Sequence, residues 1–200
     1  MRILVLHAHP RPSASVAQKA LLAAARRVEG VKLHDLYASY PDFVIDAAHE
    51  QQLLLRHDLI ILQHPFYWYS CPAIIKEWLD IVLDFDWAYG PLGNKLHGKY
   101  LMSAITTGGA EEFYSTAGRN RHTIDQFLSP FNQTAHLCGM AWLKPFVVYE
   151  GRKADEQQLA GHANYYQQVL EGFANGTVSP LKNQAKGYVL PDSFKKMRKS

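Results

Sequence analysis

Hydrophobic residues along this chain gather in short unbroken runs, separated by stretches in which they recur every third or fourth position. The clearest run covers residues 59–62, is rich in β-branched side chains and ends at Gln63-His64-Pro65. Such a run is typical of a strand that is covered on both faces. Four further strands are predicted at residues 2–8, 31–36, 100–106 and 142–149. Because Pro145 interrupts the last run, we expect that strand to start after the proline.

Between these runs, the apolar spacing is that of amphipathic helices. The helix after the central strand is expected to begin at Pro72, with Ser70 as its cap. Other helices are predicted at about residues 16–27, 47–56, 124–138 and 155–173. Strands alternating with helices imply a parallel sheet with right-handed crossovers. The predicted fold class is therefore α/β and flavodoxin-like, with five parallel strands in the order 2-1-3-4-5 and helices on both faces.

Composition narrows the class of protein. The chain has 200 residues, 48% of them hydrophobic and 20% charged, which suits one globular domain. No apolar run approaches the roughly 18 residues of a spanning helix, and no export signal precedes the first strand. Cys71 and Cys138 match no metal spacing and fit two free thiols in a reducing compartment. We therefore expect a cytoplasmic protein.

Charge is distributed unevenly between the body and the carboxyl end. Residues 182–200 hold six Lys or Arg and one Asp, so they carry +5, whereas residues 1–181 sum to −2. We expect a domain at residues 1–176 and a basic extension at residues 177–200. The extension fits a solvated tail or a segment that docks on an acidic partner or anionic lipid. The mildly acidic body does not favour nucleic acid as a partner.

Candidate chemistry lies in three loops at one edge of the predicted sheet. In the order 2-1-3-4-5, the carboxyl ends of strands 1, 3 and 4 are neighbours. The first loop, residues 9–18, runs into a helix amino end, where free N–H groups favour an anion, and His9, Ser13 and Ser15 add donors. This predicts a phosphate site, although both serines could be only helix caps. His7 and His9 have the spacing of metal ligands, but no third ligand is evident, so no metal is predicted.

The other two loops suit a planar ligand. Residues 66–69 are aromatic and could cover one side of a ring, or they could belong to the core. Thr106-Thr107-Gly108-Gly109 would let the backbone approach a flat ligand closely, or it could form a tight turn. Together with a phosphate end, these loops fit flavin mononucleotide.

Several motifs, in order along the chain, resemble flavodoxin-like NAD(P)H:quinone oxidoreductases. The branch that is most similar is the ancillary proteins of bacterial glutathione-gated potassium-efflux systems. The resemblance covers about residues 2–175. It rests on His9-Pro10 with Ser15, Gln63-His64-Pro65 with Trp68-Tyr69-Ser70 and Pro72, Trp87-Ala88-Tyr89-Gly90, His97-Gly98-Lys99, Thr106-Thr107-Gly108-Gly109, and Asp35-Leu36-Tyr37 with Tyr40-Pro41-Asp42-Phe43 and Ile45-Asp46.

The resemblance assigns roles residue by residue. Flavin phosphate and ribityl contacts are implied for His9, Ser15, Val16, Ala17 and Gln18, where relatives commonly carry Asn at position 18. Ring contacts are implied for Phe66, Tyr67, Trp68, Tyr69, Thr106, Thr107, Gly108 and Gly109. Tyr114 matches a tyrosine that stabilises charge near the flavin pyrimidine. The histidine that assists it in relatives is replaced by Asn120, with His122 two residues further on.

The resemblance implies an enzyme that takes a hydride from NAD(P)H through bound FMN, which is favoured over FAD, to a quinone or similar small acceptor. It also implies a homodimer and a membrane potassium-efflux transporter as partner, which would place the protein on the inner face of the cell membrane. The alternative is a regulatory flavin- or nucleotide-binding module of that transporter without significant turnover. An electron carrier is disfavoured by the weak body charge, and a serine hydrolase by the lack of a G-x-S-x-G turn.

Overall fold

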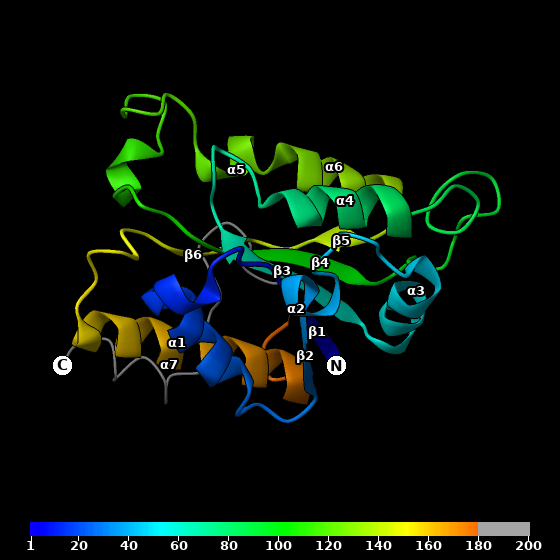
Figure 1. Cartoon of the computed structure of the whole chain (residues 1–200), viewed down its shortest axis with the longest axis horizontal. Coiled ribbons are helices and arrows are strands. Elements are labelled where there is room, and N and C mark those ends of the chain that lie inside the picture. The colour runs from blue at the N-terminus through cyan, green and yellow to red at the C-terminus, as the bar shows by residue number, and fades with distance from the viewer. Residues whose placement is uncertain (180–200) are drawn as a thin grey trace.

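The protein, described here by a computed structural model for residues 1–179, folds around one parallel sheet between two layers of helices (Figure 1). The strands are β1 (Ile3–His7), β2 (Val31–Asp35), β3 (Leu59–Pro65), β4 (Tyr100–Thr106), β5 (Ala141–Trp142) and β6 (Phe146–Val148). Their order is β2-β1-β3-β4-β5, with β6 also paired to β4. The predicted fold class and strand order are confirmed. The predicted basic extension lies mostly outside the described residues.

The helices cover both faces of the sheet. They are α1 (Val16–Ala25), α2 (Leu36–Ser39), α3 (Ala47–Arg56), α4 (Ala73–Val82), α5 (Ile124–Phe127), α6 (Ser129–Leu137) and α7 (Glu156–Asn175). In Figure 1, α1 and α7 lie on one side of the sheet and α4, α5 and α6 lie on the other. Short 3-10 helices occur at Pro12–Ala14 and Glu111–Phe113.

Alternation along the central strands explains why both faces are apolar. Ile61 of β3 is buried in the layer that contains α1 and α7, and its neighbour Leu62 is buried in the layer that contains α4 and α6. All seven residues of β3 are buried, as expected for a strand covered on both sides. The polar end of β3, Gln63 and His64, is equally buried, so the strand continues past the residues at which its apolar run ends.

Two local predictions, for the fifth strand and for the cap of α4, differ from the structure. The fifth strand does not simply start after Pro145; it is split into β5 and β6, which pair with opposite ends of β4. Ser70 does not cap α4, whose cap is Pro72 without a side-chain hydrogen bond; the Ser70 hydroxyl points instead to the Cys71 sulfur at 3.9 Å. The connection after β2 contains α2, which Asp35 caps through the Ala38 N–H.

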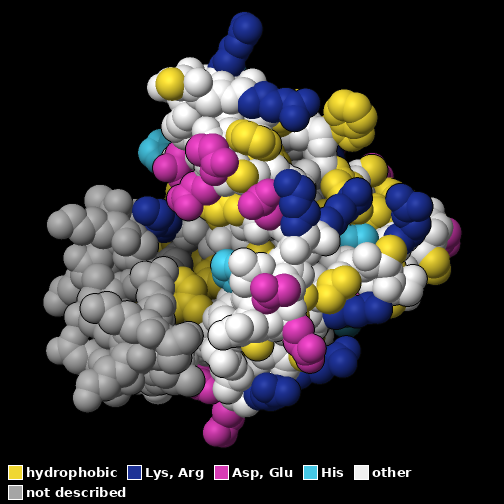
Figure 2. Space-filling model, turned by 90° about the vertical axis from the view of Figure 1, so that its left-hand side faces the viewer, with side chains coloured by type: hydrophobic (Ala, Val, Ile, Leu, Met, Phe, Trp, Pro, Cys, Tyr) yellow, Lys and Arg dark blue, Asp and Glu magenta, His cyan; other side chains and the backbone are white. Residues whose placement is uncertain are grey.

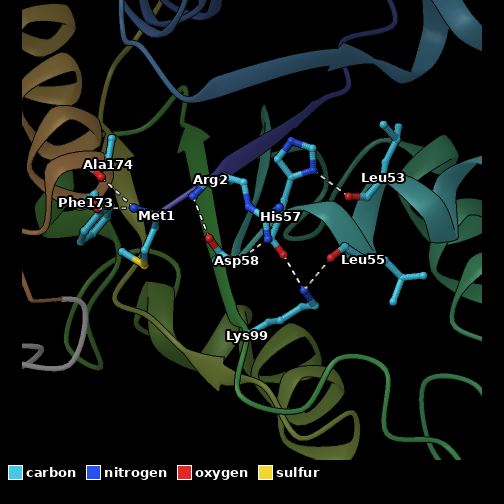
Figure 3. A network of polar contacts seen from close by, with 9 residues as sticks. All are labelled: Met1, Arg2, Leu53, Leu55, His57, Asp58, Lys99, Phe173 and Ala174. Atoms are coloured by element: carbon cyan, nitrogen blue, oxygen red, sulfur yellow. Dashed lines mark hydrogen bonds and ion pairs between the residues drawn. The ribbon is translucent and has the colours of Figure 1, made fainter.

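The amino edge of the sheet is tied together by polar contacts (Figure 3). Lys99, which precedes β4, donates from Nζ to the carbonyl oxygens of Leu55 and His57 at 3.3 and 2.6 Å. A cation at the end of α3 also complements the helix dipole there. Arg2 donates to Asp58 from its backbone N–H and from its guanidinium, at 2.8 and 3.2 Å. The start of β1, the end of α3 and the start of β4 are thereby held in register.

A buried carboxylate, that of Glu50, connects α3 with α4 and with the end of β2. Glu50 of α3 is fully buried and accepts from His34 Nε2, Tyr40 Oη and Trp78 Nε1 at 2.7, 2.6 and 2.7 Å. Burial opposes ionisation, but these three hydrogen bonds outweigh it and lower the pKa of Glu50. We call these four residues the Glu50 cluster. It connects β2, α3 and α4 through one satisfied charge.

Candidate functional site

A cavity of about 510 Å³ opens at the carboxyl edge of the sheet, within the range of small-molecule sites. Figure 2 looks onto this edge, where Lys and Arg side chains stand around exposed hydrophobic ones. All three predicted loops contribute to the cavity, and the loop after β6 joins them. The lining residues are His9, Arg11, Ala14, Ser15, Val16, Ala17, Pro65, Phe66, Tyr67, Thr106, Thr107, Gly108, Gly151 and Arg152.

One end of the cavity is the amino terminus of α1. Ser15 caps the helix by accepting from the Gln18 N–H at 3.2 Å, so its own hydroxyl hydrogen remains able to donate outward. The first N–H groups of a helix have no partner within it. Val16 and Ala17, whose N–H groups are of this kind, both line the cavity. This end of the cavity therefore offers converging donors to an anion.

His9 is oriented by its own loop. Its Nδ1 accepts from the Arg11 backbone N–H at 3.0 Å, so the neutral ring carries its hydrogen on Nε2. Burial and the nearby guanidinium groups of Arg11 and Arg152 lower the pKa of His9, and both arginines therefore lie within electrostatic reach of it. His9 is available as a neutral donor at the cavity wall.

Gln18 lies beneath the cavity and does not line it. Its side chain is 1% exposed and donates from Nε2 to Thr106 Oγ1 at 3.2 Å. Gln63 donates to Gln18 Oε1 at 3.0 Å, and Tyr166 donates to Gln63 Oε1 at 3.1 Å. This buried chain of hydrogen bonds connects α7, β3, α1 and β4 and ends on Thr106, which does line the cavity. The role of Gln18 in the structure is to support that residue.

The aromatic loop divides into a buried part and an exposed part. Phe66 is 9% exposed and lines the cavity with Tyr67, whereas Trp68 is 94% exposed. Trp68 and Tyr69 both have positive φ, 48° and 63°, in a turn closed by the Ser70 N–H donating to Tyr67 O at 2.9 Å. Positive φ is unfavourable for bulky residues. Trp68 is therefore not a core residue, and neither Trp68 nor Tyr69 lines the cavity.

Within the Thr106–Gly109 segment, the first three residues line the cavity and Gly109 does not. A side chain at Gly108 would meet nothing within 4 Å, so the backbone there faces open space and lines the cavity. A side chain at Gly109 would instead meet Phe113 at 3.1 Å and the Tyr114 hydroxyl at 3.4 Å. Gly109 thus lies under the Tyr114 ring, away from the cavity wall.

Tyr114 lies beside the cavity, with its ring 5.9 Å from that of Phe66 and 5.8 Å from that of Tyr149. Burial raises the pKa of Tyr114, although hydrogen bonds from Thr107 and Asn120 oppose the shift. The phenol therefore stays protonated at neutral pH. Asn120 contacts the Tyr114 hydroxyl, whereas His122 is exposed and its ring nitrogen meets the Asn120 carbonyl at 3.2 Å. Of the two candidate neighbours, Asn120 is the one that reaches Tyr114.

The sequence did not single out the residues that the loop after β6 brings in. Gly151 donates its N–H to Thr107 O at 2.9 Å, and Arg152 follows it into the cavity. Arg11 also lines the cavity; it lies within the predicted first loop but was not among the donors named there. One sequence feature could have indicated Gly151 and Arg152, namely that they follow a strand that lies next to β4 in the predicted order. The interruption of that strand at Pro145 made its carboxyl end hard to locate.

Within residues 1–179, no helix has both the length and the apolar character needed to cross a membrane. Nor do three or more His, Cys, Asp or Glu side chains come together there in an arrangement that would hold a metal ion.

Comparison with known proteins agrees with this geometry. The KefG ancillary protein of the glutathione-regulated potassium-efflux system from Pectobacterium atrosepticum is 50% identical over 169 residues, which are 84% of this chain and 92% of that protein. The solved structure of general stress protein 14 from Treponema denticola, in complex with FMN, is 34% identical with a TM-score of 0.82, over 86% of this chain and 99% of that one.

An NADPH-quinone reductase from P. pentosaceus is 30% identical with a TM-score of 0.78, and the match covers 85% of this chain and 98% of the reductase. A family model described as the flavodoxin-like fold matches residues 1–170. With this match, and with 50% identity to KefG over the aligned 169 residues, the chain belongs to the flavodoxin-like fold family.

Proposed function

We propose that this protein is an FMN-dependent NAD(P)H:quinone oxidoreductase that also acts as an ancillary protein of a glutathione-regulated potassium-efflux transporter. The observation that carries the enzyme proposal is the cavity, which combines an anion-binding end at α1 with an aromatic wall and an open glycine backbone. FMN has a phosphate at one end and a planar ring at the other. The FMN complex and the reductase among the solved relatives support this proposal.

The residues present fit FMN in two parts. His9, Ser15 and the first turn of α1 would hold the phosphate and ribityl chain, with Gln18 supporting Thr106 from below. Phe66, Tyr67 and the Thr106–Gly108 backbone would hold the ring. Trp68 and Tyr69 would reach it only from the exposed turn. FMN is proposed over FAD because the related general stress protein 14 was solved in complex with FMN.

FMN, when bound, supplies the hydride chemistry between NAD(P)H and the acceptor. The protein supplies orientation and donors. The Tyr114 hydroxyl, with the polar side chains of Asn120 and Thr107 beside it, keeps its proton at neutral pH and can donate toward charge that develops at the edge of the ring. Phe66 and Phe127 pack around the Tyr114 ring at 5.9 and 6.3 Å and limit water on that side.

The visible spectrum of the purified protein tests this proposal. A flavin spectrum that bleaches when NADH or NADPH is added, and returns when a quinone is added, would support a two-step enzyme. Comparing the two reductants at equal concentration would identify the preferred one. A protein that remains colourless after incubation with FMN would contradict the enzyme and the cofactor together.

The second candidate is a regulator whose flavin or nucleotide occupancy is the signal and which has little turnover. The observation that favours it is the presence of Asn120 where related reductases carry a histidine, while the His122 ring nitrogen meets the Asn120 carbonyl at 3.2 Å. A yellow protein that NAD(P)H fails to reduce within minutes would support this candidate. Co-purification with the transporter in detergent, with and without FMN, would test the partnership itself, and with it a location on the inner face of the membrane.

We also propose a homodimer. Trp68, Tyr69 and Phe85 are 94%, 50% and 56% exposed, and exposed apolar patches mark interfaces. A second cavity, of about 570 Å³, opens between α4 and α6 near Tyr89 and Leu137, so that layer presents a concave apolar surface. Sedimentation at micromolar concentration should give twice the 22.7 kDa chain mass. A monomer would contradict the dimer without affecting the cofactor proposal.

A further inference from the structure

The cavity has charges of one sign only. Two arginines line it, the one histidine there is neutral, and no Asp or Glu lines it among residues 1–179. In the same part of the chain, neither the Arg11 nor the Arg152 guanidinium has a carboxylate within ion-pair distance. These two cations come from different loops, one after β1 and one after β6. A cavity with two unpaired cations is arranged for a doubly charged anion.

The loop that carries Arg152 is fixed in place. The Gly151 N–H donates to Thr107 O at 2.9 Å, and the Glu150 N–H donates to Gly109 O at 3.1 Å. A side chain at Gly151 would lie 3.1 Å from the Ala17 side chain and 3.5 Å from that of Thr106. Glycine at this position therefore lets the loop close onto the first turn of α1. As a result, Arg152, the next residue, lines the same cavity as Ser15, Val16 and Ala17 at the amino end of α1.

Lys153, the next residue, shows that this placement is specific. Its ammonium group pairs with Glu150 at 2.8 Å, and it does not line the cavity. Two adjacent cations thus differ in role, since one is neutralised on the surface and the other faces the site. Lys153 is therefore a matched control for Arg152.

From these observations we infer that Arg11 and Arg152 form a phosphate clamp that makes the site select FMN over flavin without a phosphate. This inference rests on the proposed flavin function and extends it to the residues that set specificity. The phosphomonoester of FMN carries between one and two negative charges near neutral pH. The helix terminus, Ser15 and His9 supply neutral donors, and the two guanidinium groups supply the opposing charge.

Titration of the apo protein with FMN and with riboflavin, followed by flavin fluorescence, tests the clamp. Arg152→Gln should weaken FMN binding by roughly 5- to 30-fold and leave riboflavin binding within about twofold, because only FMN has the charge that Arg152 meets. Arg11→Gln should act in the same direction, Arg152→Lys should restore part of the loss, and Lys153→Gln should behave as wild type. FMN binding to wild type should also weaken with salt more than riboflavin binding does.

Equal losses for FMN and riboflavin would overturn the clamp, since they would show that Arg152 shapes the ring site or the fold. Unchanged FMN affinity with a raised KM for NADPH would also overturn it and would assign Arg152 to the reductant. Wild-type protein that binds neither flavin would contradict the proposed function as well. Wild-type binding of FMN with an unaltered FMN-to-riboflavin ratio in the variants would contradict the clamp alone.

Discussion

Gln18 Nε2 and Thr106 Oγ1 lie 3.2 Å apart, and they join residues 88 positions apart in the sequence across a fully buried path. Through this hydrogen bond, the Gln18 side chain from α1 supports Thr106, which lines the cavity. Since Gln18 also accepts from Gln63, one amide satisfies two buried groups at once. A change at Gln18 therefore affects both the core and the floor of the site.

Gln18→Leu should lower the free energy of unfolding by about 1–3 kcal/mol, because the Gln63 amide would lose its acceptor in a buried position. Urea unfolding of the flavin-free protein measures this. Gln52→Leu changes an exposed glutamine on α3 in the same way and should have little effect. Equal stability of the Gln18 variant and wild type would mean that Gln63 finds another partner.

Tyr114→Phe should retain flavin but slow its reduction by NAD(P)H by roughly 10- to 100-fold, equivalent to about 1.4–2.7 kcal/mol. The phenol is expected to stabilise the charged reduced form more than the oxidised form, and such differential stabilisation lowers the barrier. Stopped-flow bleaching of the flavin measures the step without the natural acceptor. Reduction at the wild-type rate would remove Tyr114 from the mechanism.

Asn120→Ala and His122→Ala identify which neighbour assists Tyr114. The contact between Asn120 and the Tyr114 hydroxyl predicts that Asn120→Ala slows the same reduction step, whereas His122→Ala has a smaller effect. The same stopped-flow assay applies to both variants. A larger loss in His122→Ala would mean that His122 turns toward the ring when the reductant binds.

Trp68→Ala should leave the thermal stability of the flavin-free protein nearly unchanged, because the side chain is 94% exposed and sits in a turn with unfavourable φ. If Trp68 contacts the flavin from that turn, the same variant should retain less FMN. Differential scanning with and without FMN separates the two effects. Marked destabilisation without flavin would show that Trp68 packs against protein in solution.

The Glu50 cluster predicts an acid-dependent loss of stability. The folded-state pKa of Glu50 lies below its ordinary value of 4.5, so its contribution is fully present above that pH and is lost as pH falls through the folded-state pKa. Glu50→Gln should therefore cost about 1–3 kcal/mol at pH 7 and flatten the decline in stability below about pH 4.5. Urea unfolding across this pH range measures both effects.

Glu77→Gln is the matched control for Glu50→Gln, because Glu77 is an exposed carboxylate on α4, whereas Glu50 on α3 is buried. The stability of the Glu77→Gln variant should depend on pH in the same way as that of wild type. If the stability of Glu50→Gln declined with falling pH in parallel with that of wild type, another carboxylate would be responsible for the loss of stability in acid.

Local pattern was sufficient for the first four strands, and their alternation with helices indicated the fold class from which the strand order follows; it did not indicate the split of the fifth strand into β5 and β6. It was sufficient for Ser15 as well, because a helix cap depends on neighbours in sequence. For Trp68 and Tyr69, local pattern left a ring-binding loop and a core position both open, and the structure excludes the core for Trp68, which is 94% exposed. Their positive φ values are a property of the folded loop and not of residue type.

The rest of the site depends on contacts between distant segments. Arg152 reaches the cavity only because Gly151 bonds to Thr107, and no spacing within the sequence indicates that approach. The family resemblance implies a flavin contact for Gln18, and in the structure its side chain turns into the core toward Gln63. In both cases, the direction of a side chain is set by a partner elsewhere in the chain.

His97, Gly98 and Lys99 lie at the opposite edge of the sheet from the cavity, roughly 20 Å away along β4. Lys99 bonds the end of α3, and the Gly98 N–H donates to Gly139 O at 3.0 Å, so a chain could keep these residues after losing every contact to a flavin. In a genome survey, the His97-Gly98-Lys99 motif would therefore identify proteins that share the fold, whether or not they bind a flavin. Gly151-Arg152 together with Arg11 would separate members that bind a phosphorylated ligand from members that retain only the shape.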